Sequence, residues 1–238
     1  MSAAIVTGAA GALGRAIAAR LAADGWAVVC VDRSPDVVGV ARDLEDDGGR
    51  ALPCIVDLAS TDAPAYVLEV AADAGGPGVL VNNAGVTRDA LATKMESEDF
   101  ALVVRVDLVA PLRLAEAIGP RLPDGGAVIN VASRAAFGNF GQANYVAAKS
   151  GLIGATRALA VRWAPRLRVN AVAPGLIDTP MTRAMPSDVL AKLVGRVPAG
   201  RAGAPAEIAA VVAFLASDEA SYVTGQTIVA CGGRSVAG

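Results

Sequence analysis

The chain has 238 residues, of which 54% are hydrophobic and none is histidine, and its net charge is −2. The lack of histidine excludes Ser-His-Asp and Cys-His hydrolysis, His-ligated metal catalysis and general-base catalysis by histidine. The slightly acidic balance argues against nucleic acid as a main partner. Acid–base chemistry must therefore come from Tyr, Lys, Asp, Glu or Cys.

Short apolar runs rich in Val and Ile alternate with longer segments of helical periodicity. Seven runs are predicted as buried strands, at residues 3–7, 27–31, 52–56, 78–81, 127–131, 167–172 and 227–230. Five segments are predicted as helices, at residues 13–23, 61–74, 98–118, 143–163 and 206–216. This alternation predicts one α/β domain over residues 1–238, a Rossmann-type doubly wound sheet of seven parallel strands with helices on both faces.

The least regular stretch is 173–205, which is rich in Pro and Gly and which we expect to contain a substrate lid. Its apolar side chains, Leu176, Ile177, Met181 and Met185, indicate a largely hydrophobic substrate.

The cysteines and the hydropathy pattern bear on the cell compartment. No apolar run approaches a membrane span, and no basic segment precedes a hydrophobic one, so we expect neither an anchor nor a secretion signal. Cys30, Cys54 and Cys231 are widely spaced and show no metal-ligand pattern. We interpret them as small apolar side chains in a reducing compartment, which predicts a cytoplasmic protein without a bound metal.

A Gly-rich turn follows the first predicted strand. Residues 7–14 read TGAAGALG and lead directly into a helix. Glycines there allow a tight turn and leave backbone N–H groups at the helix N-terminus free to face a pyrophosphate. The alternative is a tight strand-to-helix turn without a ligand.

The ends of the next two strands bear on the choice of cofactor. The second strand ends at Asp32, eighteen residues past Gly14, where a carboxylate would accept the adenosine ribose hydroxyls. A carboxylate there repels the extra phosphate of NADP, so we expect NAD, although Arg15 and Arg33 could soften that preference. Asp57 follows the third strand and either meets the adenine or simply ends the strand.

Tyr145 and Lys149 lie four residues apart in an Ala-rich segment, with Ser133 twelve residues upstream of Tyr145. On a helix, this spacing places the phenol and the ammonium on one face. An unperturbed tyrosine titrates near pH 10, and a neighbouring positive charge favours its ionised form. By itself, this spacing is usually that of a surface pair. Together with the Gly-rich turn and Asp32, it indicates an acid–base pair beside a bound nucleotide.

These features together resemble the short-chain dehydrogenase/reductase family over the whole chain. The resemblance is closest to the 3-oxoacyl-(acyl-carrier-protein) reductase branch and its NAD-linked alcohol dehydrogenase relatives. The motifs that carry it are Thr7, Gly8, Ala12 and Gly14, then Asn82, Asn83, Ala84 and Gly85, then Ser133, Tyr145, Lys149, Asn170, Pro174, Gly175 and Thr179, with the runs 138–145 and 197–201.

The resemblance implies a role for each of these residues. Ser133 would hydrogen-bond the substrate oxygen, Tyr145 would exchange a proton with it, and Lys149 would hold the nicotinamide ribose and favour the ionised phenol. The residues implied to bind the cofactor are Gly8, Ala12, Leu13, Gly14, Asp32, Asp57, Leu58, Asn83, Ala84, Gly85, Tyr145, Lys149, Pro174, Gly175, Ile177 and Thr179. Structural alternatives remain open: Ser133 as a strand-end cap, Asn82 and Asn83 as turn formers and Thr179 as a helix cap.

The chain departs from the family pattern at Asp107, where the family usually has a fourth catalytic residue, an asparagine. In the family this asparagine supports a water that links the lysine to solvent, largely through its main-chain carbonyl at a kink in the helix. A main-chain contribution survives the change to aspartate. We therefore keep Asp107 in the predicted catalytic set and hypothesise that its charge strengthens the proton relay through Lys149.

Several functions are compatible with these residues. We favour hydride transfer between NAD(H) and a secondary alcohol or ketone, possibly a 3-hydroxyacyl thioester. The alternative is 3-oxoacyl-(acyl-carrier-protein) reduction, which would use a basic docking patch, although Val161 stands where those reductases generally carry arginine. A silent NAD-sensing protein and a nucleotide-type methyltransferase are the competitors from other classes. By resemblance we expect a homotetramer formed through the helices at 98–118 and 143–163.

Overall fold

The computed structural model describes residues 2–237. Its centre is one sheet in the order β3-β2-β1-β4-β5-β6-β7, in which all pairings are parallel. The strands are β1 (Ala3–Thr7), β2 (Ala27–Asp32), β3 (Arg50–Ile55), β4 (Pro77–Asn82), β5 (Ala127–Val131), β6 (Arg168–Pro174) and β7 (Thr227–Ala230). The predicted seven-stranded parallel sheet is confirmed, whereas the single-domain prediction over 1–238 also includes residues 1 and 238, which lie outside the described range.

The pattern of side chains explains which strands are central. Every residue of β1, β5 and β6 is buried, as expected for strands covered on both faces. Pro53 sits within β3, where its missing N–H is tolerated because β3 is an edge strand.

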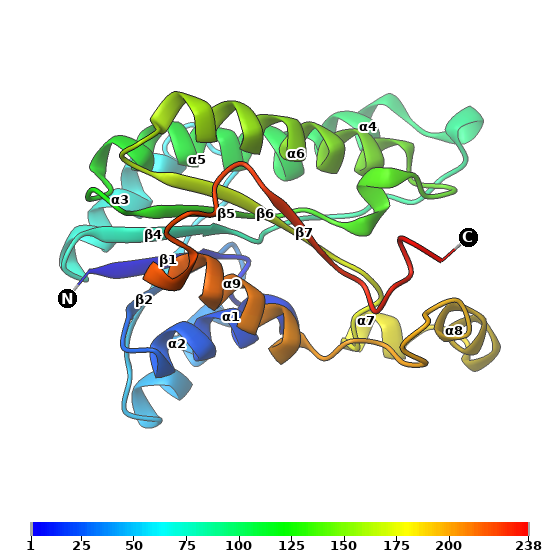
Figure 1. Cartoon of the computed structure of the whole chain (residues 1–238), viewed down its shortest axis with the longest axis horizontal. Helices are drawn as coiled ribbons and strands as arrows, with labels where there is room; N and C mark the ends of the chain where they lie inside the picture. The colour runs from blue at the N-terminus through cyan, green and yellow to red at the C-terminus, as the bar shows by residue number, and fades with distance from the viewer. Residues whose placement is uncertain (1, 238) are drawn as a thin grey trace.

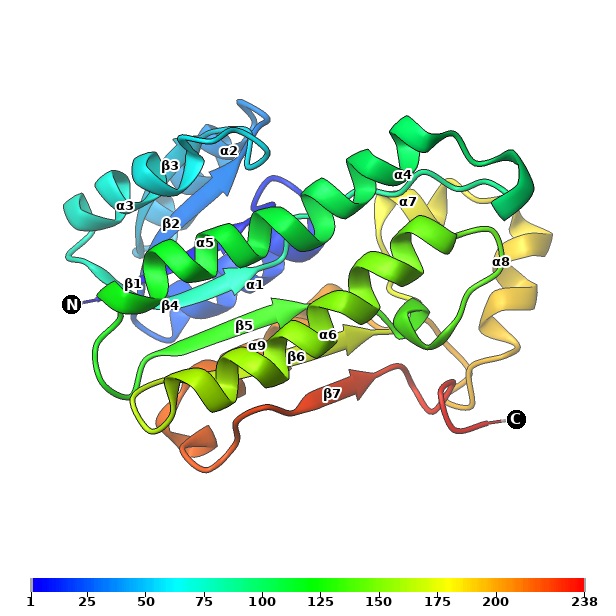
Figure 2. The same ribbon diagram turned by 90° about the horizontal axis from the view of Figure 1, so that it is seen from above.

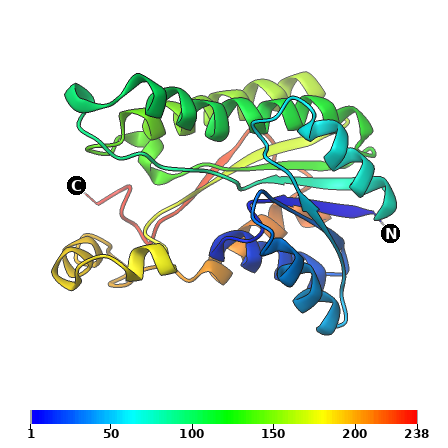
Figure 3. The same ribbon diagram turned by 180° about the vertical axis from the view of Figure 1, so that it is seen from behind.

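Helices cover both faces, as predicted (Figures 1 and 3). One face carries α1 (Ala12–Ala23), α2 (Val37–Asp46) and α9 (Pro205–Ala216), and the other carries α3 (Ala63–Asp73), α4 (Ser97–Val104), α5 (Ala110–Ile118) and α6 (Ala143–Trp163). Each face has its own apolar cluster against the sheet. The sequence analysis did not predict α2, which packs onto the sheet through Val37, Val40, Ala41 and Leu44.

The predicted helix at 98–118 is wrong as one continuous helix. A five-residue π-helical segment, Arg105–Val109, separates α4 from α5. The extra residue in this turn rotates Asp107 inward, where none of its surface is exposed. The π-helical segment therefore contains Asp107, the residue that departs from the family pattern.

The stretch 173–205 is more regular than predicted. It begins with the end of β6 and contains α7 (Pro180–Arg183) and α8 (Ser187–Val194). A bridge between Ile177 and Gly203 ties the two ends of the helical excursion together. In Figure 2, α7 and α8 lie beyond the carboxyl ends of the strands. The strand order reverses between β1 and β4, which forms a crevice at the carboxyl ends of these strands. Ligands of open α/β sheets bind at that point.

Candidate active site

The turn between β1 and α1 forms a cradle of backbone atoms. Gly8 has a φ of +67°, which favours glycine, and a side chain on Gly14 would begin 2.1 Å from the Gly8 carbonyl oxygen. The Asn83 amide holds this turn by donating to the carbonyl oxygens of Thr7 at 2.8 Å and Gly8 at 3.3 Å. Gly11 is the N-cap of α1, and no side chain there accepts a hydrogen bond from the first turn of the helix. The first-turn N–H groups are therefore free to meet an anionic group.

The Asp32 carboxylate is fixed by two backbone donors. Its Oδ2 accepts from the Ala10 N–H and its Oδ1 from the Ser34 N–H, each at 3.0 Å. The bond from Ala10 ties the end of β2 to the cradle, and the bond from Ser34 holds the turn that follows β2. They hold a negative charge beside the turn, in the position that the sequence predicts for contact with a ribose.

A cleft of about 660 Å³ joins the cradle to the predicted catalytic residues. An adjoining hollow of about 130 Å³ lies between the ends of β2, β3 and β4 and shares Gly8, Asp32 and Gly85 with the cleft. Every predicted cofactor residue lines one or the other: Gly8, Ala12, Leu13, Gly14, Asp32, Asn83, Gly85, Tyr145, Lys149, Pro174, Gly175, Ile177 and Thr179 line the cleft, and Asp57, Leu58 and Ala84 line the hollow. A dinucleotide fits this arrangement, because uncapped amides, an oriented carboxylate and a side pocket follow one another along one surface.

Tyr145 and Lys149 both lie near the start of α6 and face the cleft. Asn144 fixes that start, since its side chain accepts from the Tyr145 N–H at 2.7 Å and donates to the Arg88 carbonyl oxygen at 2.9 Å. Lys149 is 3% exposed, donates to the Val131 carbonyl oxygen at 3.0 Å and stands 5.5 Å from the centre of the Tyr145 ring. The helical spacing predicted from sequence is therefore present, with the ammonium held in place by β5.

Ser133 lies at the carboxyl end of β5 and lines the same cleft. Its hydroxyl oxygen accepts from the Ala135 N–H at 3.1 Å and so caps the short helix Arg134–Phe137. Ser133 is thus the N-cap of the helix that follows β5, rather than the cap of the strand end that we considered as its structural alternative. Accepting that bond leaves the hydroxyl hydrogen available for a substrate oxygen, so both roles are compatible.

Asp107 does not line the cleft and lies behind Lys149 instead. Its Oδ1 accepts from the Val86 N–H at 2.8 Å, and its Oδ2 faces the Lys149 Nζ at 3.3 Å. Burial raises the pKa of Asp107, against the lowering effects of the Lys149 charge and the Val86 N–H. Asp107 therefore contacts two residues of the cleft, Lys149 and Val86, without lining the cleft itself.

Thr179 and Thr182 stabilise the start of α7, which lines the cleft. Thr179 is the N-cap of α7, and the Thr182 N–H and hydroxyl form a capping box with it. Thr182 also lines the cleft and donates to the Ile177 carbonyl oxygen at 2.8 Å. The sequence analysis missed Thr182, although a threonine three residues after an N-cap threonine, with Pro180 between them, signals this box.

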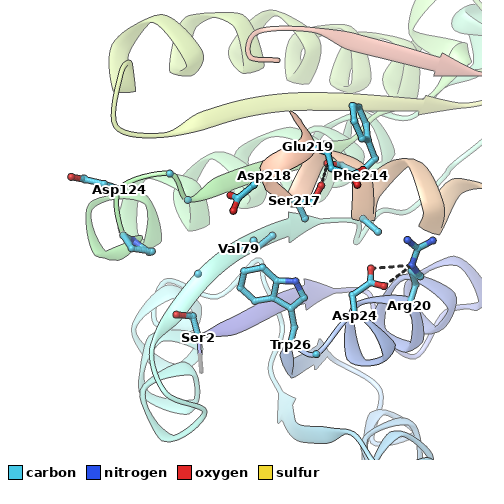
Figure 4. A pocket seen from close by; sticks show the side chains of 17 residues that line it. Ser2, Arg20, Asp24, Trp26, Val79, Asp124, Phe214, Ser217, Asp218 and Glu219 are labelled. Carbon is cyan, nitrogen blue, oxygen red and sulfur yellow. Dashed lines mark hydrogen bonds and ion pairs between the residues drawn. The ribbon is translucent and has the colours of Figure 1, made fainter. Parts of the chain in front are cut away.

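A larger hollow of about 780 Å³ lies at the opposite edge of the sheet (Figure 4). It surrounds Trp26 at the amino ends of the strands and contains the exposed Arg20–Asp24 ion pair. It includes none of the predicted site residues. Because ligands of such sheets bind at the carboxyl ends of the strands, the cleft is the candidate active site.

Among residues 2–237, no group of three or more His, Cys, Asp or Glu side chains could hold a metal ion. The described helices include none that is both long and apolar enough to cross a membrane.

Known proteins resemble this chain over almost all of its length. A family model described as enoyl-(acyl carrier protein) reductase matches residues 8–235. The 3-oxoacyl-[acyl-carrier-protein] reductase FabG of Escherichia coli is 43% identical over 97% of this chain and 96% of its own. The chain belongs to the short-chain dehydrogenase/reductase family. It is accordingly an oxidoreductase that acts on CH–OH groups and binds a nicotinamide cofactor.

Solved structures of short-chain dehydrogenases agree with this assignment. One, assigned provisionally as an NAD(P)-dependent gluconate 5-dehydrogenase from Beutenbergia cavernae, holds NADP at low occupancy. It has a TM-score of 0.92 and 38% identity, covering 98% of this chain and 96% of that one. Another, assigned provisionally as a short-chain alcohol dehydrogenase from Sinorhizobium meliloti, has a TM-score of 0.93 and 35% identity over the same shares.

Proposed function

We propose that the enzyme interconverts a secondary alcohol and a ketone with NAD(H), and that its substrate is a 3-hydroxyacyl or 3-oxoacyl thioester. The observation that carries the proposal is that Ser133, Tyr145 and Lys149 line the same cleft as the cradle of α1. The thioester part is supported by the 43% identity to an enzyme named for 3-oxoacyl reduction.

Ser133, Tyr145 and Lys149 have different roles toward the substrate oxygen. A bound nicotinamide would supply or accept the hydride. The Ser133 hydroxyl donates to the carbonyl oxygen, the Tyr145 hydroxyl gives that oxygen its proton in reduction, and the Tyr145 phenolate takes the proton back in oxidation. Lys149 provides a fixed positive charge beside the phenol, because the Val131 carbonyl oxygen restrains its Nζ.

We propose NAD as the preferred cofactor on the strength of Asp32. Its two backbone hydrogen bonds hold the carboxylate where the 2′-phosphate of NADP would bring more negative charge. Arg33 lines the adjoining hollow, where its positive charge would attract the 2′-phosphate and oppose this repulsion. Arg15 instead pairs with the exposed Asp43. NADP in the Beutenbergia cavernae structure makes it the alternative to test.

A carrier-bound form of this thioester and a sugar acid also have specific support as substrates. Carrier-linked reduction is favoured by the name of the Escherichia coli relative, although Val161, at the position expected to be basic, is 81% exposed and apolar. Oxidation of a sugar acid is favoured by the assignment of the Beutenbergia cavernae structure. Both use the same cleft and the same proton transfer.

An initial-rate panel tests the proposal. The purified enzyme is assayed with NAD(H) and NADP(H) against 3-oxoacyl thioesters, neutral secondary alcohols and gluconate. We expect the highest kcat/KM with a thioester and NAD(H), and a loss of 10²- to 10⁴-fold in Tyr145→Phe, which lacks the proton donor. Full activity in Tyr145→Phe on the best substrate would overturn the mechanism, and the absence of any turnover across the panel would overturn the proposed function.

We further propose a cytoplasmic homotetramer. The three cysteines are free and buried, which suits a reducing compartment. Phe100 on α4 and Val109 before α5 are each about 40% exposed, which suits an interface on this face of the molecule. Light scattering after size exclusion should give the mass of four chains, and Val109→Asp should lower it.

A further inference from the structure

Three arginines from separate segments gather at the carboxyl edge of the sheet. Arg134 directly follows Ser133 in the short helix after β5, Arg196 follows α8, and Arg234 comes four residues after β7. Since β5, β6 and β7 are neighbours in the sheet, their carboxyl ends meet at one place. We refer to Arg134, Arg196 and Arg234 as the arginine cluster.

Packing brings together the segments that carry these arginines. The Ala199 N–H donates to the Gly232 carbonyl oxygen at 3.0 Å, so the segment after α8 lies against the segment after β7. A side chain on Gly232 would begin 2.7 Å from Val197, which shows how closely the two segments approach. Ala136, two residues after Arg134, packs against the same small apolar group as Val229 of β7.

Unlike other arginines near α7 and α8, the arginines of the cluster have no carboxylate partner among the described residues. Among residues 2–237, no carboxylate forms an ion pair with any of the three, whereas Arg183 pairs with Asp178 and Arg201 with Glu207 at 2.7 Å each. Within that range, the one side-chain hydrogen bond from the cluster is a long one, from Arg134 to the Asn139 amide oxygen at 3.3 Å.

The three charges also act on one another. Arg234 is only partly exposed, and burial together with the charges of Arg134 and Arg196 lowers its pKa. Like charges held together without a counter-charge favour the binding of an anion, which would relieve their repulsion. Planar guanidinium groups are suited to carboxylate or phosphate oxygens, which they bind in pairs of hydrogen bonds.

We infer that the arginine cluster is a subsite for an anionic group of the substrate, either a carboxylate or a phosphate. The inference rests on the proposed function, because it takes Ser133 as the residue that holds the reacting oxygen. None of the three arginines lines the cleft, so the anion would lie outside it, on a distal part of a molecule whose reacting carbon is held at Ser133. The proposed substrate thus has an uncharged reacting end and a negatively charged distal end.

Matched substrates separate the two sources of negative charge. Acetoacetyl-coenzyme A carries phosphates, and acetoacetyl-N-acetylcysteamine is the same thioester without them. Gluconate carries a carboxylate, and glucitol is the matching neutral polyol. We expect the enzyme to have at least a tenfold lower KM for one anionic member than for its neutral partner.

Substitutions in the arginine cluster test whether these residues cause the difference in KM between charged and neutral substrates. Arg234→Gln and the more exposed Arg196→Gln should each raise KM for the preferred anionic substrate about tenfold, with kcat little changed and KM for its neutral partner within twofold of the parent. Arg234→Lys should restore part of the loss. Arg20→Gln, at the opposite edge of the sheet, is the control and should leave both KM values unchanged.

A binding measurement makes the test independent of turnover. Inorganic phosphate should bind the unmodified enzyme in calorimetry and compete with the anionic substrate, and both effects should weaken in Arg196→Gln but not in Arg20→Gln. Equal effects of Arg196→Gln on charged and neutral substrates, or phosphate binding that it leaves unchanged, would overturn the subsite. Phosphate binding that depends on the cluster, without turnover of any substrate, would retain the subsite and overturn the proposed function.

Discussion

The carboxylate of Asp107 faces the ammonium of Lys149 at 3.3 Å inside the protein, with the two side chains 0% and 3% exposed. The Asp107 Oδ2 has no hydrogen-bond partner among the described residues, so the Lys149 charge is its main compensation. The π-helical segment Arg105–Val109 creates this arrangement by turning residue 107 toward α6. A negative charge therefore stands directly behind the cation that flanks Tyr145.

Replacing Asp107 with asparagine should change the pH–rate profile. The buried anion partly cancels the Lys149 charge, so the Asp107→Asn variant should have a larger net positive charge beside the cleft and favour negative charge on the reacting oxygens. We expect the acidic limb of log(kcat/KM) for alcohol oxidation to move to lower pH. Profiles measured from pH 5 to pH 10 check this, and a profile identical to that of the parent would show that the Asp107 charge plays no part in the relay.

The same substitution should alter how stability depends on pH. Burial raises the folded-state pKa of Asp107 above its ordinary value, so the folded chain binds more protons than the unfolded chain between those two values. The contribution of Asp107 is therefore fully present below the unfolded-state pKa near 4 and is lost as pH rises through the folded-state pKa. Urea unfolding from pH 4.5 to pH 8 should show the parent losing stability relative to Asp107→Asn, and a constant difference would contradict the expected shift.

The sheet and the cradle were predictable because their signals are local. Val- and Ile-rich runs followed by Gly, Asp or Asn mark buried parallel strands, and the TGAAGALG run marks a turn that needs glycine at position 14. The helix α2 was missed despite its periodic Val37, Val40, Ala41 and Leu44. The π-helical segment was outside the reach of periodicity, because it inserts one residue without changing the apolar pattern on either side.

The site was predictable in its residues but less so in its hydrogen bonds. The Tyr145–Lys149 spacing predicts one helix face, yet only the fold shows that the Val131 carbonyl oxygen holds Lys149. Likewise, the position of Asp32 indicates a ribose contact, but its bonds to Ala10 and Ser34 depend on how β2 meets the cradle. The arginine cluster joins residues 134, 196 and 234, so no local pattern reveals it.

Gly85→Ala should separate Asp107 from Lys149. A Cβ at position 85 would lie 2.8 Å from the Asp107 Oδ2 and 3.4 Å from the Lys149 Nζ. Because both neighbours are buried and hydrogen-bonded, we expect a lower kcat and a loss of about 1–3 kcal/mol in the free energy of unfolding. Gly39→Ala in α2 is the control: its Cβ would meet nothing within 4 Å, so it should stabilise the protein by about 0.5–1 kcal/mol. Equal unfolding free energies for the two variants would contradict the close packing around Gly85.

Asp32→Asn should weaken the preference for NAD. The amide oxygen can keep one of the two backbone hydrogen bonds while the negative charge is removed. We expect the ratio of kcat/KM for NADP to that for NAD to rise about tenfold, since the 2′-phosphate no longer meets a carboxylate. Steady-state rates with both cofactors measure this ratio, and Asp36→Asn, on the exposed side of the same turn, should leave it unchanged. A ratio unaffected by Asp32→Asn would assign cofactor choice to Arg33 or another group.

Glu207 should stabilise the protein only above acidic pH. Its carboxylate accepts from the Ala204 N–H at 2.7 Å in the first turn of α9 and pairs with Arg201 at 2.7 Å, which lowers its pKa to about 2. A depressed folded-state pKa gives stability that is present above the unfolded-state value of 4.5 and lost as pH falls toward 2. The melting temperature of Glu207→Gln should therefore lie below that of the parent at pH 7 and approach it at pH 3. Asp188→Asn removes an exposed pair with Lys192 and should change the melting temperature less at either pH. A gap between Glu207→Gln and the parent that stays constant from pH 7 to pH 3 would mean that the ionised carboxylate is not what stabilises this end of α9.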